Sequence, residues 1–174
     1  MKYISGIVFS FSLTALLYIN GTAFCCSSLM VTAGASADGS IIVTHSCDAE
    51  SHGGIGILPA MDHEAGEMID FGADRGKIPQ VAHTYKVIRG INEFQLAVSE
   101  TTAGGREELI NPQGILEYWD LMSLSLQRAK TAREAITIFT TLAEEYGYRS
   151  SAESISIGDT KEVWILEIAG TGPG

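Results

Sequence analysis

The pattern of apolar and polar positions first predicts a β-hairpin near the start of the chain. Two apolar runs rich in β-branched residues, 28–32 and 41–44, flank the turn-forming stretch 36–40. An Asp-Gly pair inside that stretch is a strong hairpin signal, and β-branched residues favour strands. Such a hairpin brings Cys26, at the head of its first strand, close to residues 45–48 at the end of its second strand.

The middle of the chain alternates between polar stretches and short strand signals. Residues 51–76 are rich in Gly, Asp, Glu and His, which is typical of a long surface loop. Residues 84–88 and 94–98 have the composition of short strands, and residues 90–93 lie between them as a turn.

Helical periodicity follows. Apolar residues recur through 115–126 and predict a buried helix. A second helix is predicted to begin at Thr131, which forms a capping-box pattern with Glu134, and to end at Gly147. Two strands are then predicted, at residues 154–157 and 162–168. The order of strands, helices and strands predicts an α+β domain with helices packed on one face of a sheet.

Composition narrows the functional classes. The chain has 174 residues, 45% of them hydrophobic, which is enough for one folded domain. Acidic residues outnumber basic ones by 21 to 11, the net charge is −10, and no basic cluster reverses it locally. Such a surface repels phosphate backbones and anionic lipids, so nucleic acid is not expected as a partner.

The first 25 residues read as a signal peptide. Lys2 precedes the mainly apolar stretch 4–19, and small residues follow at 21–23. The alternative is a membrane anchor, but the apolar run is shorter than the roughly 20 residues that a spanning helix needs. We therefore expect residues 1–25 to be a signal peptide and residues 26–174 to belong to a protein exported to the periplasm or extracellular space. No stable membrane anchor is expected after cleavage.

The cleavage site determines the chemical state of Cys26. Ala23 and Cys25 supply small residues at the −3 and −1 positions for a cut before Cys26, and a cut after Ala23 is the main alternative. The mature chain would then contain Cys26 and Cys47, which an exported protein could join in a disulfide. These cysteines and the scattered histidines lack the spacing of a zinc site, so no metal or other cofactor is expected.

Several segments together resemble the cysteine dipeptidases related to dipeptidase A, which are N-terminal-nucleophile hydrolases. The resemblance is carried by the segments 26–32, 34–40, 92–93, 99–102, 118–119, 128–135, 162–167 and 172–174. It implies a four-layer αββα sandwich and a dipeptide as substrate. It also implies that this chain is the N-terminal part of the peptidase domain, an incomplete sandwich without a later Asn donor, and that it is impaired as a fragment.

The chemistry of Cys26 supports the same hypothesis independently. A cysteine at a mature N-terminus carries an α-amino group with an ordinary pKa of about 7.7–8.0, which can accept the thiol proton. The thiolate then attacks a peptide carbonyl and forms an acyl-enzyme. The alternative for Cys26 is an inert buried cysteine or half of a disulfide.

The resemblance also implies roles for five other residues. Asp48 falls where the family carries an acidic residue near the N-terminal amine, and His45 stands where many relatives have Arg. A neutral histidine does not supply the permanent charge of arginine, so His45 would bind substrate or simply pack. Glu100, Thr101 and Thr102 match the region where the superfamily places donors for the oxyanion, and they are expected to bind the substrate or the oxyanion.

Two other functions remain open from the sequence. One is an amide acylase of the choloylglycine or penicillin type, which uses the same nucleophile on another amide. The other is a non-catalytic exported binding domain, in which Cys26 pairs with Cys47. The sequence leaves the formation of a homo-oligomer open as well.

Overall fold

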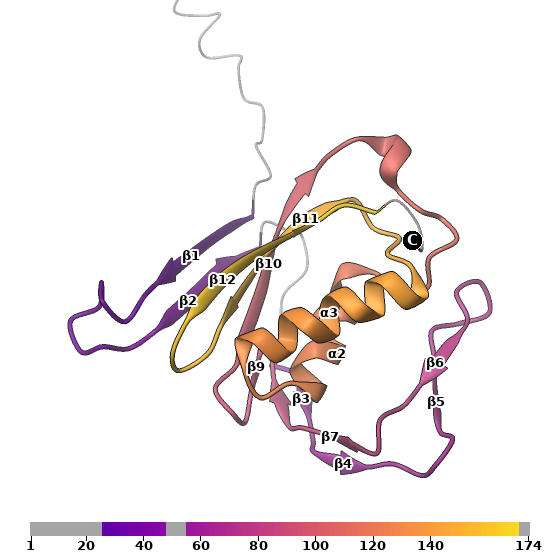
Figure 1. Cartoon of the computed structure of the whole chain (residues 1–174), viewed down its shortest axis with the longest axis horizontal. Coiled ribbons are helices and arrows are strands. Elements are labelled where there is room, and N and C mark those ends of the chain that lie inside the picture. Colours follow the sequence, from indigo (N-terminus) through magenta and orange to yellow (C-terminus); the bar gives the residue numbers. More distant parts are fainter. Residues whose placement is uncertain (1–25, 48–54, 171–174) are drawn as a thin grey trace, which may run out of the picture.

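The computed structural model describes residues 26–47 and 55–170 (Figure 1). The predicted signal peptide and Asp48 lie outside the described residues. A six-stranded antiparallel sheet has the order β12-β11-β10-β9-β8-β3. Its strands are β3 (Ile57–Leu58), β8 (Val87–Ile88), β9 (Ile91–Asn92), β10 (Ala97–Gly104), β11 (Ala152–Gly158) and β12 (Val163–Ile168).

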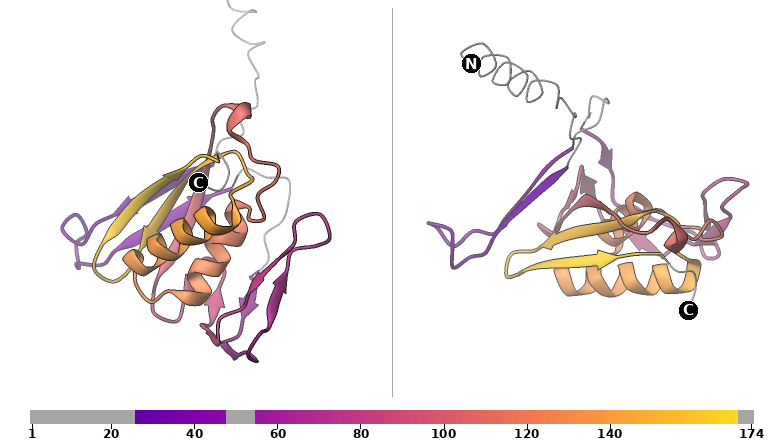
Figure 2. Two further views of the ribbon diagram at one scale, coloured as in Figure 1. Left: turned by 45° about the vertical axis from the view of Figure 1, so that its right-hand side comes forward. Right: turned by 90° about the horizontal axis from the view of Figure 1, so that it is seen from above.

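The predicted hairpin is confirmed. Strands β1 (Ser27–Val31) and β2 (Ile42–Ser46) pair in antiparallel register, with Ser28 opposite His45. Figure 2 shows the hairpin on one side of the sheet and the helices on the other. The contact with the sheet is close, because a Cβ built on Gly158 of β11 would lie 2.7 Å from Val43 Cγ2.

Both predicted helices are present on one face of the sheet, so the α+β prediction is confirmed. Helix α2 (Tyr118–Arg128) starts three residues later than the apolar periodicity suggested, and α3 (Ala132–Tyr146) begins after Thr131, whose hydroxyl accepts a hydrogen bond from the Glu134 N–H. Gly147 ends α3 with a φ of 77°. The core between helices and sheet contains Leu96, Val98, Leu121, Phe139, Ile155 and Ile157.

The middle of the chain differs most from the prediction. Residues 51–76 were expected to form a loop, but their described part contains β3, β4 (Met61–Asp62) and β5 (Met68–Asp70), which pairs with β6 (Lys77–Pro79). The expected strand 84–88 is divided into β7 (His83–Thr84) and β8, and β4 pairs with β7. Strands of two or three residues are too short to show an alternating pattern in the sequence. Whether such residues form a strand depends on the partner strand with which they pair.

Two boundaries around β9 were also wrong. The turn predicted at residues 90–93 lies at Arg89 and Gly90, whose φ values of 34° and 81° are both positive, as a tight two-residue hairpin turn requires. The strand predicted at 94–98 starts at Ala97 and extends to Gly104. A 3-10 helix, η1 (Glu107–Leu109), follows β10.

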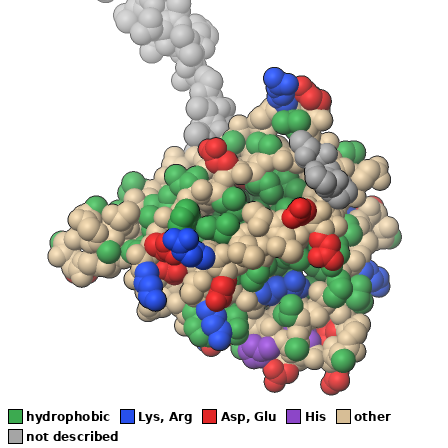
Figure 3. Space-filling model, in the orientation of Figure 1, with side chains coloured by type: hydrophobic (Ala, Val, Ile, Leu, Met, Phe, Trp, Pro, Cys, Tyr) green, Lys and Arg blue, Asp and Glu red, His purple; other side chains and the backbone are tan. Residues whose placement is uncertain are grey.

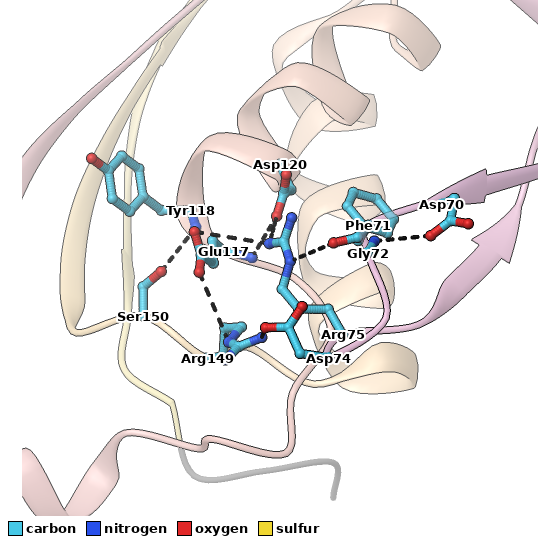
Figure 4. A network of polar contacts seen from close by, with 10 residues as sticks. All are labelled: Asp70, Phe71, Gly72, Asp74, Arg75, Glu117, Tyr118, Asp120, Arg149 and Ser150. Atoms are coloured by element: carbon cyan, nitrogen blue, oxygen red, sulfur yellow. Dashed lines mark hydrogen bonds and ion pairs between the residues drawn. The ribbon is translucent and has the colours of Figure 1, made fainter.

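A network of charges fixes the start of α2 (Figure 4). Arg75 Nη1 lies 2.6 Å from Asp120 Oδ2 and 3.8 Å from Glu117 Oε2, and Arg75 Nε donates to the Phe71 carbonyl. Asp120 in turn accepts the Glu117 N–H, which completes a capping box. The network joins the loop after β5 to the first turn of α2, and it therefore holds Tyr118 at the end of the sheet.

The surface carries charges of both signs. Figure 3 shows acidic and basic side chains interspersed over one face of the molecule. Trp119 is 52% exposed although its helix was predicted to be buried, because it lies on the face of α2 that borders Ile57, Leu58 and Val87 in an open groove. In the part of the chain that the structure describes, no helix has the length and apolar character needed to cross a membrane.

Asn92 joins the sheet to the helices. Its Nδ2 donates to the Leu126 and Ala129 carbonyls, at 2.9 and 2.7 Å. Its Oδ1 accepts from the Phe94 and Leu96 N–H groups, at 3.0 and 3.1 Å. The side chain is buried, so these bonds satisfy carbonyls at the end of α2 that water does not reach.

Asn92→Ala is expected to lower the free energy of unfolding by about 2–4 kcal/mol, because buried carbonyl groups lose their donors. Urea unfolding followed by circular dichroism measures the change, with the exposed Gln113→Ala as the matched control. A loss as small as that of the control would show that the side chain does not hold the helix end.

Candidate active site

The hairpin brings Cys26 and His45 to the same face. Cys26 directly precedes β1, where Ser27 pairs with Ser46 and Ser28 with His45. Side chains alternate along a strand, so Cys26 and Ser28 point to one side, and His45 lies directly across from Ser28. Cys26 is partly buried, and among the described residues it is not joined to Cys47 in a disulfide.

Strand β10 lies against this face of the hairpin. A hydrogen bond of 2.8 Å joins Ser28 Oγ and Thr101 Oγ1, and Ser28 Oγ also donates to the Glu100 carbonyl at 3.3 Å. His45 Nε2 lies 3.8 Å from Glu100 Oε1. The structure therefore brings together four predicted site residues: Cys26, His45, Glu100 and Thr101.

The segment 99–102 was predicted to follow a strand, and this was wrong. Residues Ser99 to Thr102 lie inside β10, because Thr101 and Thr102 continue the pairing with Ser154 and Glu153 of β11. Within the described residues, β9 pairs with β10 at Ala97 alone. Beyond Ala97, β10 contacts the hairpin through Ser28.

A pair of buried carboxyl groups lies on the neighbouring strands β10 and β11. Thr102 of β10 is directly opposite Glu153 of β11, and Glu100 is two residues from Thr102 on the same face. Glu100 is 7% exposed and Glu153 is 1% exposed. Each has an Oε2 atom that is buried and has no hydrogen-bond partner. Two acids so close together in the interior cannot easily both be ionised.

The local electrostatics follow from burial and from this pair. Burial raises the pKa of Glu153 to about 7, and the charge of Glu100 adds to the shift, while a hydrogen bond from Thr102 acts in the opposite direction. Burial also raises the pKa of Tyr118 to about 12, with further contributions from Glu100, Glu153, Cys47 and Cys26 in that order. Tyr118 therefore stays a neutral hydroxyl at neutral pH.

Tyr118 lies where the start of α2 meets the segment that leads into β11. Tyr118 is the first residue of α2, and its N–H donates to Ser150 Oγ at 3.2 Å. This hydrogen bond ties the first residue of α2 to the chain just before β11.

Sequence reasoning missed Glu153 and Tyr118. The predicted strand began at residue 154 and left Glu153 outside it, whereas β11 begins at Ala152. Glu153 lies on the same face of β11 as Ile155 and Ile157, which are fully buried. An acidic residue at a position where the alternating pattern of a strand calls for an apolar one is the sequence signal that could have revealed Glu153.

The two described histidines outside this site, His63 and His83, each contact a carboxylate. His63 Nδ1 is 2.9 Å from Glu67 Oε1, and His83 Nδ1 is 2.6 Å from Asp62 Oδ1. Both are carboxylate contacts that the sequence spacing did not suggest. Across residues 26–47 and 55–170, no group of three or more His, Cys, Asp or Glu side chains is arranged to hold a metal ion.

Comparison with known protein families shows to which family of enzymes the chain belongs. The sequence model of peptidase family C69 matches residues 53–173, which is more than half of the chain. The chain belongs to peptidase family C69. The resemblance to the cysteine dipeptidases is thereby confirmed, and so is the prediction of a peptidase, of the cysteine class. The matched region contains β10, both helices and β11, and with them Glu100, Tyr118 and Glu153. It begins after the hairpin that carries Cys26.

Glu153 makes the stability of this peptidase depend on pH. Its folded pKa of about 7 lies above the ordinary value of 4.5, so the folded protein holds this proton more tightly than the unfolded chain. The contribution of Glu153 to the free energy of unfolding is fully present below about pH 4.5 and is lost as the pH rises to about 7. Glu153→Gln mimics the protonated acid, so the variant is expected to be more stable than the native protein at pH 8 by about 3 kcal/mol, and similar to it at pH 4.5.

Thermal unfolding across pH 4.5–8 measures this effect. Glu167→Gln, an exposed glutamate on the neighbouring strand β12, is the matched control and is expected to follow the native protein at every pH. A Glu153→Gln variant that loses stability with rising pH as the native protein does would contradict the buried-acid assignment.

Proposed function

We propose that this C69 peptidase is an exported dipeptidase that uses Cys26 as its nucleophile and the α-amino group of a mature N-terminal Cys26 as its base. The observation that carries the proposal is the position of Cys26 at the head of β1, on the hairpin face that contacts Glu100 and Thr101. Membership in a family of cysteine peptidases supports it independently.

In the proposed reaction, Cys26 supplies both the nucleophile and the base. The α-amino group takes the thiol proton, and the thiolate forms a bond to the carbonyl carbon of the dipeptide. The resulting ammonium returns the proton to the leaving amine as the C–N bond breaks, which leaves an acyl-enzyme on Sγ. Water then gives a proton to the amine as its oxygen bonds to the acyl carbon. The C–S bond breaks, the carboxylic acid product leaves, and the ammonium returns its proton to the thiolate.

The surroundings of Cys26 suit a developing oxyanion. Thr101 and Thr102 lie on β10, where Thr101 contacts Ser28 of the hairpin, and on the resemblance we assign both to the oxyanion. Tyr118 is proposed as a further neutral hydroxyl donor. His45 takes the place of the family's Arg and contacts Glu100, so we assign it to substrate binding or packing. Asp48 is proposed, on the resemblance, to orient the α-amino group.

We further propose that the domain has the N-terminal-nucleophile hydrolase architecture. Helices, a sheet and a second β-layer made by the hairpin follow one another in Figure 2, which supports three layers of an αββα sandwich. We propose a dipeptide as the partner and export by the signal peptide, with no lasting membrane anchor.

The mature protein is expected to begin at Cys26, because the base in this mechanism is the α-amino group of that residue. Intact-mass and N-terminal sequencing of the protein secreted by its producing cells measures this. An active form that begins at Phe24 would contradict the proposal.

Cys26→Ala and Cys26→Ser are expected to lose at least about a thousand-fold in kcat on unblocked dipeptides, with an unchanged circular dichroism spectrum. Asp48→Ala is expected to lose less, because it orients the amine and does not attack. Cys47→Ser is the matched control and should keep its turnover. Undiminished turnover in a folded Cys26→Ala variant would exclude Cys26 as the nucleophile.

A further inference from the structure

An open cavity separates part of the β1–β2 hairpin from the central sheet. The cavity has a volume of about 450 Å³ and lies between residues 39–43 of the hairpin and a sheet surface that includes Ile91, Ala97 and Gly158. A two-stranded hairpin is only marginally stable in water by itself. The contacts that bridge hairpin and sheet on either side of this cavity therefore decide how precisely the end that carries Cys26 is held.

Near Cys26, the hydroxyl group of Ser28 bridges the hairpin and the sheet. Ser28 Oγ lies 2.8 Å from Thr101 Oγ1 and donates a hydrogen bond to the Glu100 carbonyl at 3.3 Å. Both bonds are partly buried, so water competes with them less than it does at the surface. They connect β1 to β10, two strands that are not neighbours in any sheet of the described residues.

The position of Ser28 in β1 couples this contact to the thiol. Cys26, Ser28 and Met30 are partly buried, whereas Ser27 and Leu29 between them are exposed. This alternation places Cys26 and Ser28 on the face of the hairpin that is turned toward the sheet. The two residues are separated by a step of about 7 Å along the strand, so a shift of Ser28 relative to β10 also shifts the thiol.

We propose that Ser28 is a positioning residue of this peptidase: its hydroxyl, paired with that of Thr101, sets the distance between the Cys26 thiol and β10. The inference rests on the proposed function and adds a residue that the proposed reaction does not use. Ser28 acts through the strand and exchanges no proton with the thiol, because a step of about 7 Å is too long for a hydrogen bond.

The experiment compares Ser28→Ala with Ser27→Ala, the matched control, whose side chain lies on the exposed face of the same strand. Ser28→Ala is expected to lower kcat on alanyl-alanine by about ten-fold or more and to change KM by less than about two-fold, because a misplaced nucleophile slows the chemical step. Ser27→Ala should keep both values. Ser28→Thr, which restores a hydroxyl, should recover most of the lost kcat.

Two further measurements separate positioning from a general loss of stability. In Ser28→Ala, the amides of residues 27–31 are expected to exchange hydrogen faster than in the native protein, while those of α3 keep their protection. Iodoacetamide needs no positioned substrate, so it should alkylate Cys26 at least as fast in Ser28→Ala as in the native protein. Faster exchange throughout the protein, or alkylation that slows as much as kcat, would contradict the positioning role.

A double variant tests the pairing with Thr101. Thr101→Val keeps the shape of the side chain and removes its hydroxyl. If the two hydroxyls form one contact, adding Ser28→Ala to Thr101→Val lowers kcat little further, whereas fully additive losses would overturn the pairing.

The proposal and the function on which it rests fail in different ways. Turnover by Ser28→Ala equal to that of Ser27→Ala would overturn the positioning role and leave the dipeptidase proposal untouched. Undiminished turnover by a folded Cys26→Ala variant would refute the proposed function. The positioning role would then fall with it, even if the amides of β1 exchanged faster in Ser28→Ala.

Discussion

The arrangement of the active site depends on the contact between the β1–β2 hairpin and the central sheet. A two-stranded hairpin is only marginally stable in water, so β1 and β2 need a surface to pack on. Val43 against Gly158 and Ser28 against Thr101 provide that surface at two separate points. Because Cys26 directly precedes β1, the position of its thiol is set by how firmly the hairpin is seated on β10 and β11.

The opposite face of the same sheet imposes a second constraint. The helices cover an apolar surface formed by Val98, Ile155 and Ile157, and this surface becomes acidic toward the end where Tyr118 begins α2. Arg75 and its partners hold that helix end in place, and Asn92 holds the other. The helix layer therefore does more than cover the sheet: it seals the acidic end from water and fixes the phenol beside it.

This position gives the carboxyl pair its chemical character. Near the surface, Glu100 and Glu153 would be ordinary solvated acids with little effect on one another. In the interior, burial and the charge of Glu100 raise the pKa of Glu153, and burial and the charges of both acids raise the pKa of Tyr118.

The sequence by itself determined the parts that local chemistry encodes. The Asp-Gly turn predicted the hairpin, and Thr131 and Gly147 marked the ends of α3. Segments spread between residues 26 and 174 pointed to the family that the comparison then confirmed over residues 53–173. Only the tertiary structure decided that Glu100 and Glu153 share one buried position. They are 53 residues apart in the chain, and the pairing of β10 with β11 brings them together. The two-residue strands β3, β4 and β7 escaped prediction for the same reason, because a partner distant in sequence defines each of them.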